Sequence, residues 1–438
     1  MNKYSDFRAT STGSYLALYF ASCIMNAAFL LVFAWHLLTR SFYFDMLVEQ
    51  YTSLAYVLIV WVCLGWLMAL VAAIGFDILP LIHGSSPFEE TTMRQFWILN
   101  VTGQTVLIFS TFMKSLEGIE EFSTVGIVLL SLGVILLGVP GRRLYQESKR
   151  KKNNDEVGIV SLIPGLIFPF FGGTIIVCWL LRDTVGVLEL GRSIMIMLYL
   201  LITVAMIVSH FNRRLNWSII EPSKIPLRFG IFFVFLGLHI LFSFLAAREA
   251  SETLTLLGLM KDYSLGMAFF SAFFVCNPLG VAKKAFMHGG MAHNRLVFAA
   301  LWTLPFCSFH AFNSAQYSER IGIPGYATFL STTAILAVWG YAIYLHEDHL
   351  HINIHKRRSN FLFMAIFLIG FIAIQVLFVK NWMDWGSTAL EERIWFWLIP
   401  VASAMIVIKI LRQTVLSLDT WHKIPMFYGR YMQEKSHE

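Results

Sequence analysis

Long apolar runs separated by short polar stretches recur along the whole sequence. Roughly 20 apolar residues span the hydrocarbon core of a bilayer, and a run of 18 or more with few charges predicts a transmembrane helix. The pattern predicts an all-α, polytopic helical bundle that forms one integral membrane domain over residues 1–438. The twelve predicted helices lie at about 15–38, 54–76, 95–115, 122–140, 158–181, 193–210, 228–247, 264–282, 295–312, 326–345, 360–379 and 394–412.

The composition supports a lipid environment. Charged residues make up 14% of the chain and the mean hydropathy is +0.66, whereas about a quarter of the residues in a soluble protein are charged. Twelve helices and their connections use nearly all of the 438 residues. A separate soluble domain is therefore not expected.

The distribution of Lys and Arg predicts the orientation. With both termini in the cytoplasm, 24 of the 33 basic residues fall on the cytoplasmic side and nine on the opposite side. Such an asymmetry is the positive-inside signal of membrane proteins. The net charge of +6 therefore orients the chain in the membrane, and nucleic acid is not expected as a partner. The longest polar segment, 141–157, is predicted to be a cytoplasmic loop.

Few polar side chains interrupt the predicted helices, and each is a functional candidate because polar groups are unfavourable in hydrocarbon. His239 and His310 could each ligate a haem iron, or could hydrogen-bond a neighbouring helix. Asn100 and Gln104 lie one turn apart and are predicted to join helices through hydrogen bonds. No carboxylate lies near the middle of a predicted helix, which disfavours a proton- or sodium-coupled carrier.

A second group of candidates consists of histidines in the predicted cytoplasmic segments. Imidazoles combined with carboxylates suit borderline divalent metals. A solvated segment beside the membrane is the alternative interpretation. The candidate metal ligands are His346, His349, His351, His355, His288 and His293.

Three consecutive segments resemble the haem-copper oxidase catalytic subunit superfamily, especially the C-type oxidases and the nitric oxide reductases. The segments read FFVFLGLHILFSF, then FFVCNPLGVAKKAF, then NRLVFAALWTLPFCSFHAFNS followed by IPGYATFLSTTAILAVWGYAIYL. The resemblance covers about 228–345 and implies a twelve-helix fold that holds two haems and a copper ion.

The sequence departs from the family at the metal ligands. Cys276 and Asn277 stand where the family has its first copper-ligating histidine, and the family's His-His pair is reduced to His310. The segment WMDWGSTALEERIWFWLIP, which corresponds to the family's H-x-H helix, has no histidine. Copper needs about three imidazoles, so copper and a catalytically competent oxidase are not expected. A haem held by His239 or His310 remains a candidate cofactor.

Three functions are compatible with the sequence. The first is a membrane subunit of a respiratory or electron-transfer assembly in the bacterial inner membrane, in contact with lipid and with other membrane or redox subunits. The second is a twelve-helix secondary transporter, for which the Pro and Gly residues at Asn277–Gly280 suggest a broken helix. The third is a membrane metalloenzyme that uses the cytoplasmic histidines.

Overall fold

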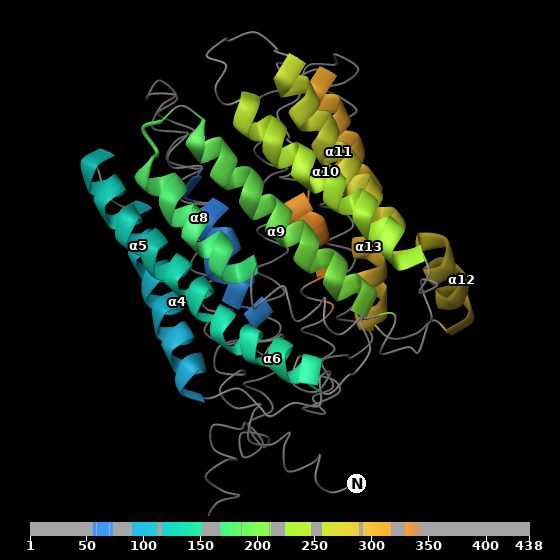
Figure 1. Ribbon diagram of the computed structural model, residues 1–438, viewed down its shortest axis with the longest axis horizontal. Coiled ribbons are helices and arrows are strands. Elements are labelled where there is room, and N and C mark those ends of the chain that lie inside the picture. Colours follow the sequence, from blue (N-terminus) through green and yellow to red (C-terminus); the bar gives the residue numbers. More distant parts are fainter. Residues whose placement is uncertain are drawn as a thin grey trace, which may run out of the picture. The chain divides into compact units, whose positions relative to one another are not determined.

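Within the part of the chain that the computed structural model describes, every element is a helix, as the sequence predicts (Figure 1). The described residues are 56–57, 59–69, 71–72, 90–111, 116–150, 167–184, 186–209, 211, 224–246, 256–288, 292–316, 329–334, 336–337 and 340.

Three helices among the described residues are long and apolar enough to cross a membrane. They are Glu120–Arg143, Val187–Val208 and Pro226–Ala246, and they fall on the predicted fourth, sixth and seventh helices. These helices are compatible with an integral membrane protein. The count of twelve and the side on which the termini lie remain predictions. Outside the described residues are the predicted helices 15–38, 360–379 and 394–412.

The described residues form two compact units, which divide at Leu180 within what the sequence predicts as one membrane domain. The first unit contains the π-helix η1 (Trp61–Leu67), α4 (Glu90–Thr111), α5 (Leu116–Leu136), α6 (Gly138–Arg150) and α8 (Phe168–Leu180).

Glycines allow the helices of the first unit to pack closely. A Cβ added to Gly103 of α4 would lie 2.8 Å from Leu130 of α5, and one added to Gly126 of α5 would lie 2.6 Å from Leu107 of α4. Small residues at such crossings let two backbones approach each other, which is how helices associate where lipid provides no hydrophobic driving force. Of the α4–α5 pair, α8 packs against α5.

The second unit begins after Leu180. It contains α9 (Val187–Ser209), α10 (Ile225–Ala246), α11 (Leu256–Val275), α12 (Pro278–His288), α13 (Ala292–Gln316) and the π-helix η5 (Phe329–Ala334).

α10 and α11 are antiparallel neighbours in the second unit, and α13 packs against α11. Two contacts set the register of the α10–α11 pair: Arg228 donates to the Phe274 carbonyl, and His239 donates to the Lys261 carbonyl. Most of the apolar window of α9 is buried, whereas most of that of α10 is exposed. The open face of α10 is therefore the face available to lipid.

Two helices begin earlier than their hydropathy predicts. α11 starts at Leu256 rather than 264, and α9 starts at Val187 rather than 193. The apolar run marks the depth of the hydrocarbon, whereas the backbone hydrogen bonds of a helix continue into the polar region beyond it. The segment 141–157 also differs from the predicted loop, because α6 extends through Arg150. Arg, Leu, Gln, Glu and Lys, which are good helix formers, occupy most of that extension.

Gly266 lies against the ring of Phe312 at the crossing of α11 and α13, with no room for a Cβ. Gly266→Ala is therefore expected to lower the free energy of unfolding by about 1–3 kcal/mol through overpacking. Gly237→Ala is the control, because nothing lies within 4 Å of a Cβ at that position. Alanine favours a helix interior over glycine, so the control should raise stability. Titration of detergent-solubilised protein with sodium dodecyl sulfate would measure both, and equal changes would contradict the packing.

Candidate functional site

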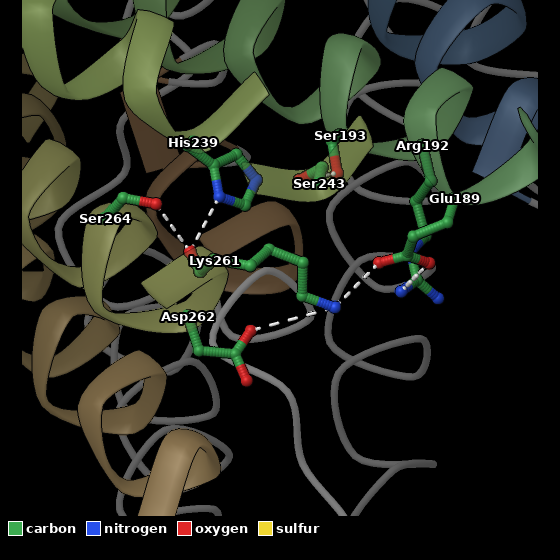
Figure 2. Close-up of polar contacts among 8 residues, drawn as sticks. All are labelled: Glu189, Arg192, Ser193, His239, Ser243, Lys261, Asp262 and Ser264. Atoms are coloured by element: carbon green, nitrogen blue, oxygen red, sulfur yellow. Dashed lines mark hydrogen bonds and ion pairs between the residues drawn. The ribbon is translucent and has the colours of Figure 1, made fainter. Parts of the chain in front are cut away.

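Four charged side chains from α9 and α11 form a cluster at one end of the second unit (Figure 2). Glu189 of α9 accepts hydrogen bonds from Arg192 on its own helix and from Lys261 of α11, the latter at 3.1 Å. The Lys261 Nζ also lies 4.0 Å from the carboxylate of Asp262. Two acids and two bases leave the cluster neutral.

His239 of α10 is held beside this cluster by α11. Its Nδ1 lies 2.9 Å from the Lys261 carbonyl, which also accepts from Ser264 at 2.7 Å. A carbonyl only accepts, so Nδ1 carries a proton. Burial favours the neutral ring, in which Nε2 presents a lone pair. That Nε2 atom is buried and has no partner within the described part of the chain, and His239 is only 2% exposed.

Two buried hydroxyls, one on α9 and one on α10, extend the group of polar side chains from His239 towards α9. Ser193 of α9 donates to Ser243 of α10 at 2.9 Å. Ser243 lies one turn after His239, so both side chains are on the same side of α10 (Figure 2). The site therefore combines a neutral imidazole, two hydroxyls and a compensated set of charges. An imidazole in this state can ligate a metal ion or accept a proton.

The two candidate haem ligands lie on different helices, His239 on α10 and His310 on α13. His310 is fully buried on α13, whose Ser308 donates to the Gly266 carbonyl of α11 at 2.6 Å. No contact described in the second unit joins His310 to His239. His239 fits one axial position, because metal-ligating histidines usually donate their other ring nitrogen to a carbonyl or carboxylate.

The predicted metal ligands remain a prediction. His288 ends α12 and His293 lies in the first turn of α13, but the side chains of both lie outside the described set. Among the described residues, no three His, Cys, Asp or Glu side chains are grouped to hold a metal ion. Outside the described residues lie His346, His349, His351 and His355.

The helix that carries Cys276 and Asn277 is broken at these residues. α11 ends at Val275, Asn277 has a φ of 47°, and α12 begins at Pro278. Proline suits the first position of a helix because it has no N–H to satisfy there. The Phe274 carbonyl, exposed by the break, accepts from the Asn277 N–H and from Arg228 of α10, each at 3.1 Å. The helix break predicted at Asn277–Gly280 is therefore confirmed.

Asn100 and Gln104 join helices in the first unit, as predicted. The Asn100 Nδ2 atom donates to the Leu64 and Gly65 carbonyls of η1, each at 3.1 Å. Gln104 donates to Asn100 at 2.6 Å and accepts from the Trp61 indole at 3.2 Å. The Asn100 amide therefore binds backbone carbonyls in the wider turn of the π-helix, where regular i to i−4 bonding is interrupted.

The charged cluster was not predicted as a site. Glu189 and Arg192 are three residues apart on one helix, a spacing that indicates an ion pair and could have been read from the sequence. Lys261 gave no such signal, because it lies 72 residues from Glu189 and reaches it only through the packing of α9, α10 and α11.

The environment of the cluster shifts the pKa values of two side chains, Lys261 and Asp262, which lie beyond the predicted span 264–282. Burial alone would lower the pKa of Lys261, but the carboxylates of Glu189 and Asp262 outweigh burial and raise it above its ordinary value of 10.5. Burial raises the pKa of Asp262 above its ordinary value of 3.8. Lys261 is therefore held charged, whereas burial makes the charged form of Asp262 less favourable than it is in water.

A raised pKa means that the folded protein holds the Lys261 proton more tightly than the unfolded chain does. The resulting stability is fully present below pH 10.5 and is lost as the pH rises through the higher folded value. The wild type should therefore lose more stability above pH 10.5 than Lys261→Met does. Detergent unfolding on either side of that pH would measure the difference in stability. Equal losses of stability in both proteins would argue against the pairing of Lys261 with Glu189.

Comparison with known proteins assigns no family. No family model matches the chain, and no curated protein or solved structure matches it.

Proposed function

We propose that this protein is a membrane subunit of an electron-transfer assembly in the bacterial inner membrane, built on an oxidase-like frame that lacks the haem-copper centre. Long apolar helices support the membrane location. The segments that resemble the oxidase subunit correspond to α10, to α11 with α12, and to α13. α10 packs against α11 and α11 against α13, so these segments are neighbours in space as well as in sequence.

The observation that carries this proposal is the break at Cys276 and Asn277. In the family that the chain resembles, this helix contributes a histidine to copper. Here the equivalent position has a fully buried thiol, followed by a residue with positive φ at a helix break. About three imidazoles are needed for a copper site, and at the family's copper-ligand positions this chain retains only His310. The arrangement favours a subunit that packs against redox partners over one that reduces oxygen.

His239 is the residue that fits a retained haem. Its Nδ1 is fixed on the Lys261 carbonyl, which directs the lone pair of Nε2 away from that carbonyl. The buried Nε2 has no partner within the described residues, so it is available to an axial iron bond. A bound haem would supply one-electron transfer at this end of the helices. The chain itself would orient the ligand and exclude water from it.

Purification in mild detergent from its native membrane tests the proposed role. The chain should co-purify in a fixed ratio with polypeptides that contain haem or iron–sulfur clusters, and a reductant should reduce those centres. The same preparation should show no oxygen consumption that depends on this chain. Isolation of the chain without any redox-active partner, together with substrate transport by the purified protein, would contradict the proposal.

The break between α11 and α12 also favours a second candidate, a secondary transporter. Interrupted membrane helices in transporters present unwound backbone to a substrate or ion near the middle of the bilayer. Asn277, with its φ of 47°, supplies such an unwound residue. Substrate-stimulated flux in proteoliposomes that contain only this chain would support transport, and its absence across substrate classes would favour the electron-transfer role.

A further inference from the structure

α6 is continuous with a membrane-spanning segment. The candidate span Glu120–Arg143 runs through α5 and ends inside α6. At the junction, the Leu137 N–H donates to the Gly133 carbonyl at 3.2 Å, and the Gly141 N–H donates to the Leu137 carbonyl at 3.4 Å. Helical hydrogen bonding therefore continues from one helix into the next. The first turns of α6 consequently lie where the hydrocarbon meets the headgroups.

The basic residues of α6 occupy a repeated position. Arg142 and Arg143 are exposed, and Lys149 and Arg150 follow seven positions later in the sequence. Seven residues are two turns of an α-helix, so both pairs fall on the same helical face about 10 Å apart along the axis. The helix carries one acidic residue, Glu147, against these four basic ones. α6 is therefore an amphipathic, positively charged helix.

We propose that α6 binds the anionic phospholipid headgroups of the leaflet at this end of α5. Basic residues beside a membrane are attracted to anionic lipid, and the attraction falls off within a Debye length of about 10 Å. The covalent link to the span keeps Arg142 and Arg143 within that distance of the headgroups. An acidic partner protein is a competing occupant, but the continuity of α6 with the candidate span favours lipid, because it places the helix at the membrane surface.

Native mass spectrometry of the full-length protein tests this proposal. The protein is mixed in detergent with phosphatidylglycerol or phosphatidylcholine, and the lipids that it retains are counted. The test variant is R142Q/R143Q/K149Q/R150Q. The control, R142K/R143K/K149R/R150K, keeps every positive charge and the helical residues, so it separates the effect of charge from an effect on folding.

The wild type and the control should both prefer phosphatidylglycerol, and added salt should weaken that preference. Each charge removed should reduce the preference by about fivefold, so the glutamine variant should lose most of it. An unchanged preference in the glutamine variant would overturn the proposal. The proposal would also be overturned if the glutamine variant lost only the binding of a co-purifying acidic polypeptide and kept its lipid preference. That result would assign α6 to a protein partner.

Discussion

Glu189→Gln is expected to lower the free energy of unfolding by about 2–4 kcal/mol, because two cations would lose the carboxylate that they share. Arg192 and Lys261 both bind Glu189, and the side chains of all three are about a quarter exposed. Removal of one partner from a partly buried ion pair takes away the nearest counter-charge of the other, and here two cations lose it. Titration with sodium dodecyl sulfate in mixed micelles would measure the change.

Asp262→Asn provides the matched control for this prediction. Asp262 also lies beside Lys261, but at 4.0 Å, and burial raises its pKa, which makes its charged form less favourable. This variant should therefore change stability by less than about 1 kcal/mol. The double variant E189Q/K261M should recover part of the loss, since one unpaired cation is removed with its partner. Equal effects of Glu189→Gln and Asp262→Asn would mean that Glu189 does not organise the cluster.

Asn100→Leu is expected to lower the free energy of unfolding by a similar amount, about 2–4 kcal/mol. Leucine would leave the Leu64 and Gly65 carbonyls without the Asn100 amide, and would leave the Gln104 amide without its acceptor. Asn100 and Gln104 are both buried, so water cannot replace these bonds readily. The same detergent titration would measure the loss.

Thr105→Val is the control on the same helix. The Thr105 hydroxyl donates to the Val101 carbonyl of its own helix at 2.8 Å and joins no second element. Its removal should change stability by less than about 1 kcal/mol, because backbone helical bonding is retained. If Thr105→Val were as damaging as Asn100→Leu, the interhelical role of Asn100 would be wrong.

The sequence predicts the helices better than their ends. Apolar runs located α5, α9 and α10 because a bilayer requires a long stretch without charge. The same runs could not locate the start of α11, since Lys261 and Asp262 end the hydropathy signal while the helix continues to Leu256. The predicted loop after α5 likewise contains a helix, because charged residues with good helix propensity resemble loop residues in hydropathy.

The candidate site was only partly visible in the sequence. His239 could be selected because a polar side chain in an apolar run is rare, but its orientation depends on the carbonyl of Lys261. The break at Asn277 was predictable from Asn-Pro followed by Gly, since such residues interrupt helices. Arg228, which binds the carbonyl at that break, was not predictable because the contact depends on the register of α10 against α11.

We propose that an oxidase-like helical frame here lacks the ligands for a haem-copper centre. A reduced-minus-oxidised absorption spectrum of the purified chain, combined with quantification of iron and copper, tests this claim most directly. The account predicts no copper and at most one haem per chain, with any haem signal lost in His239→Leu. Two haems and one copper ion per chain would contradict it.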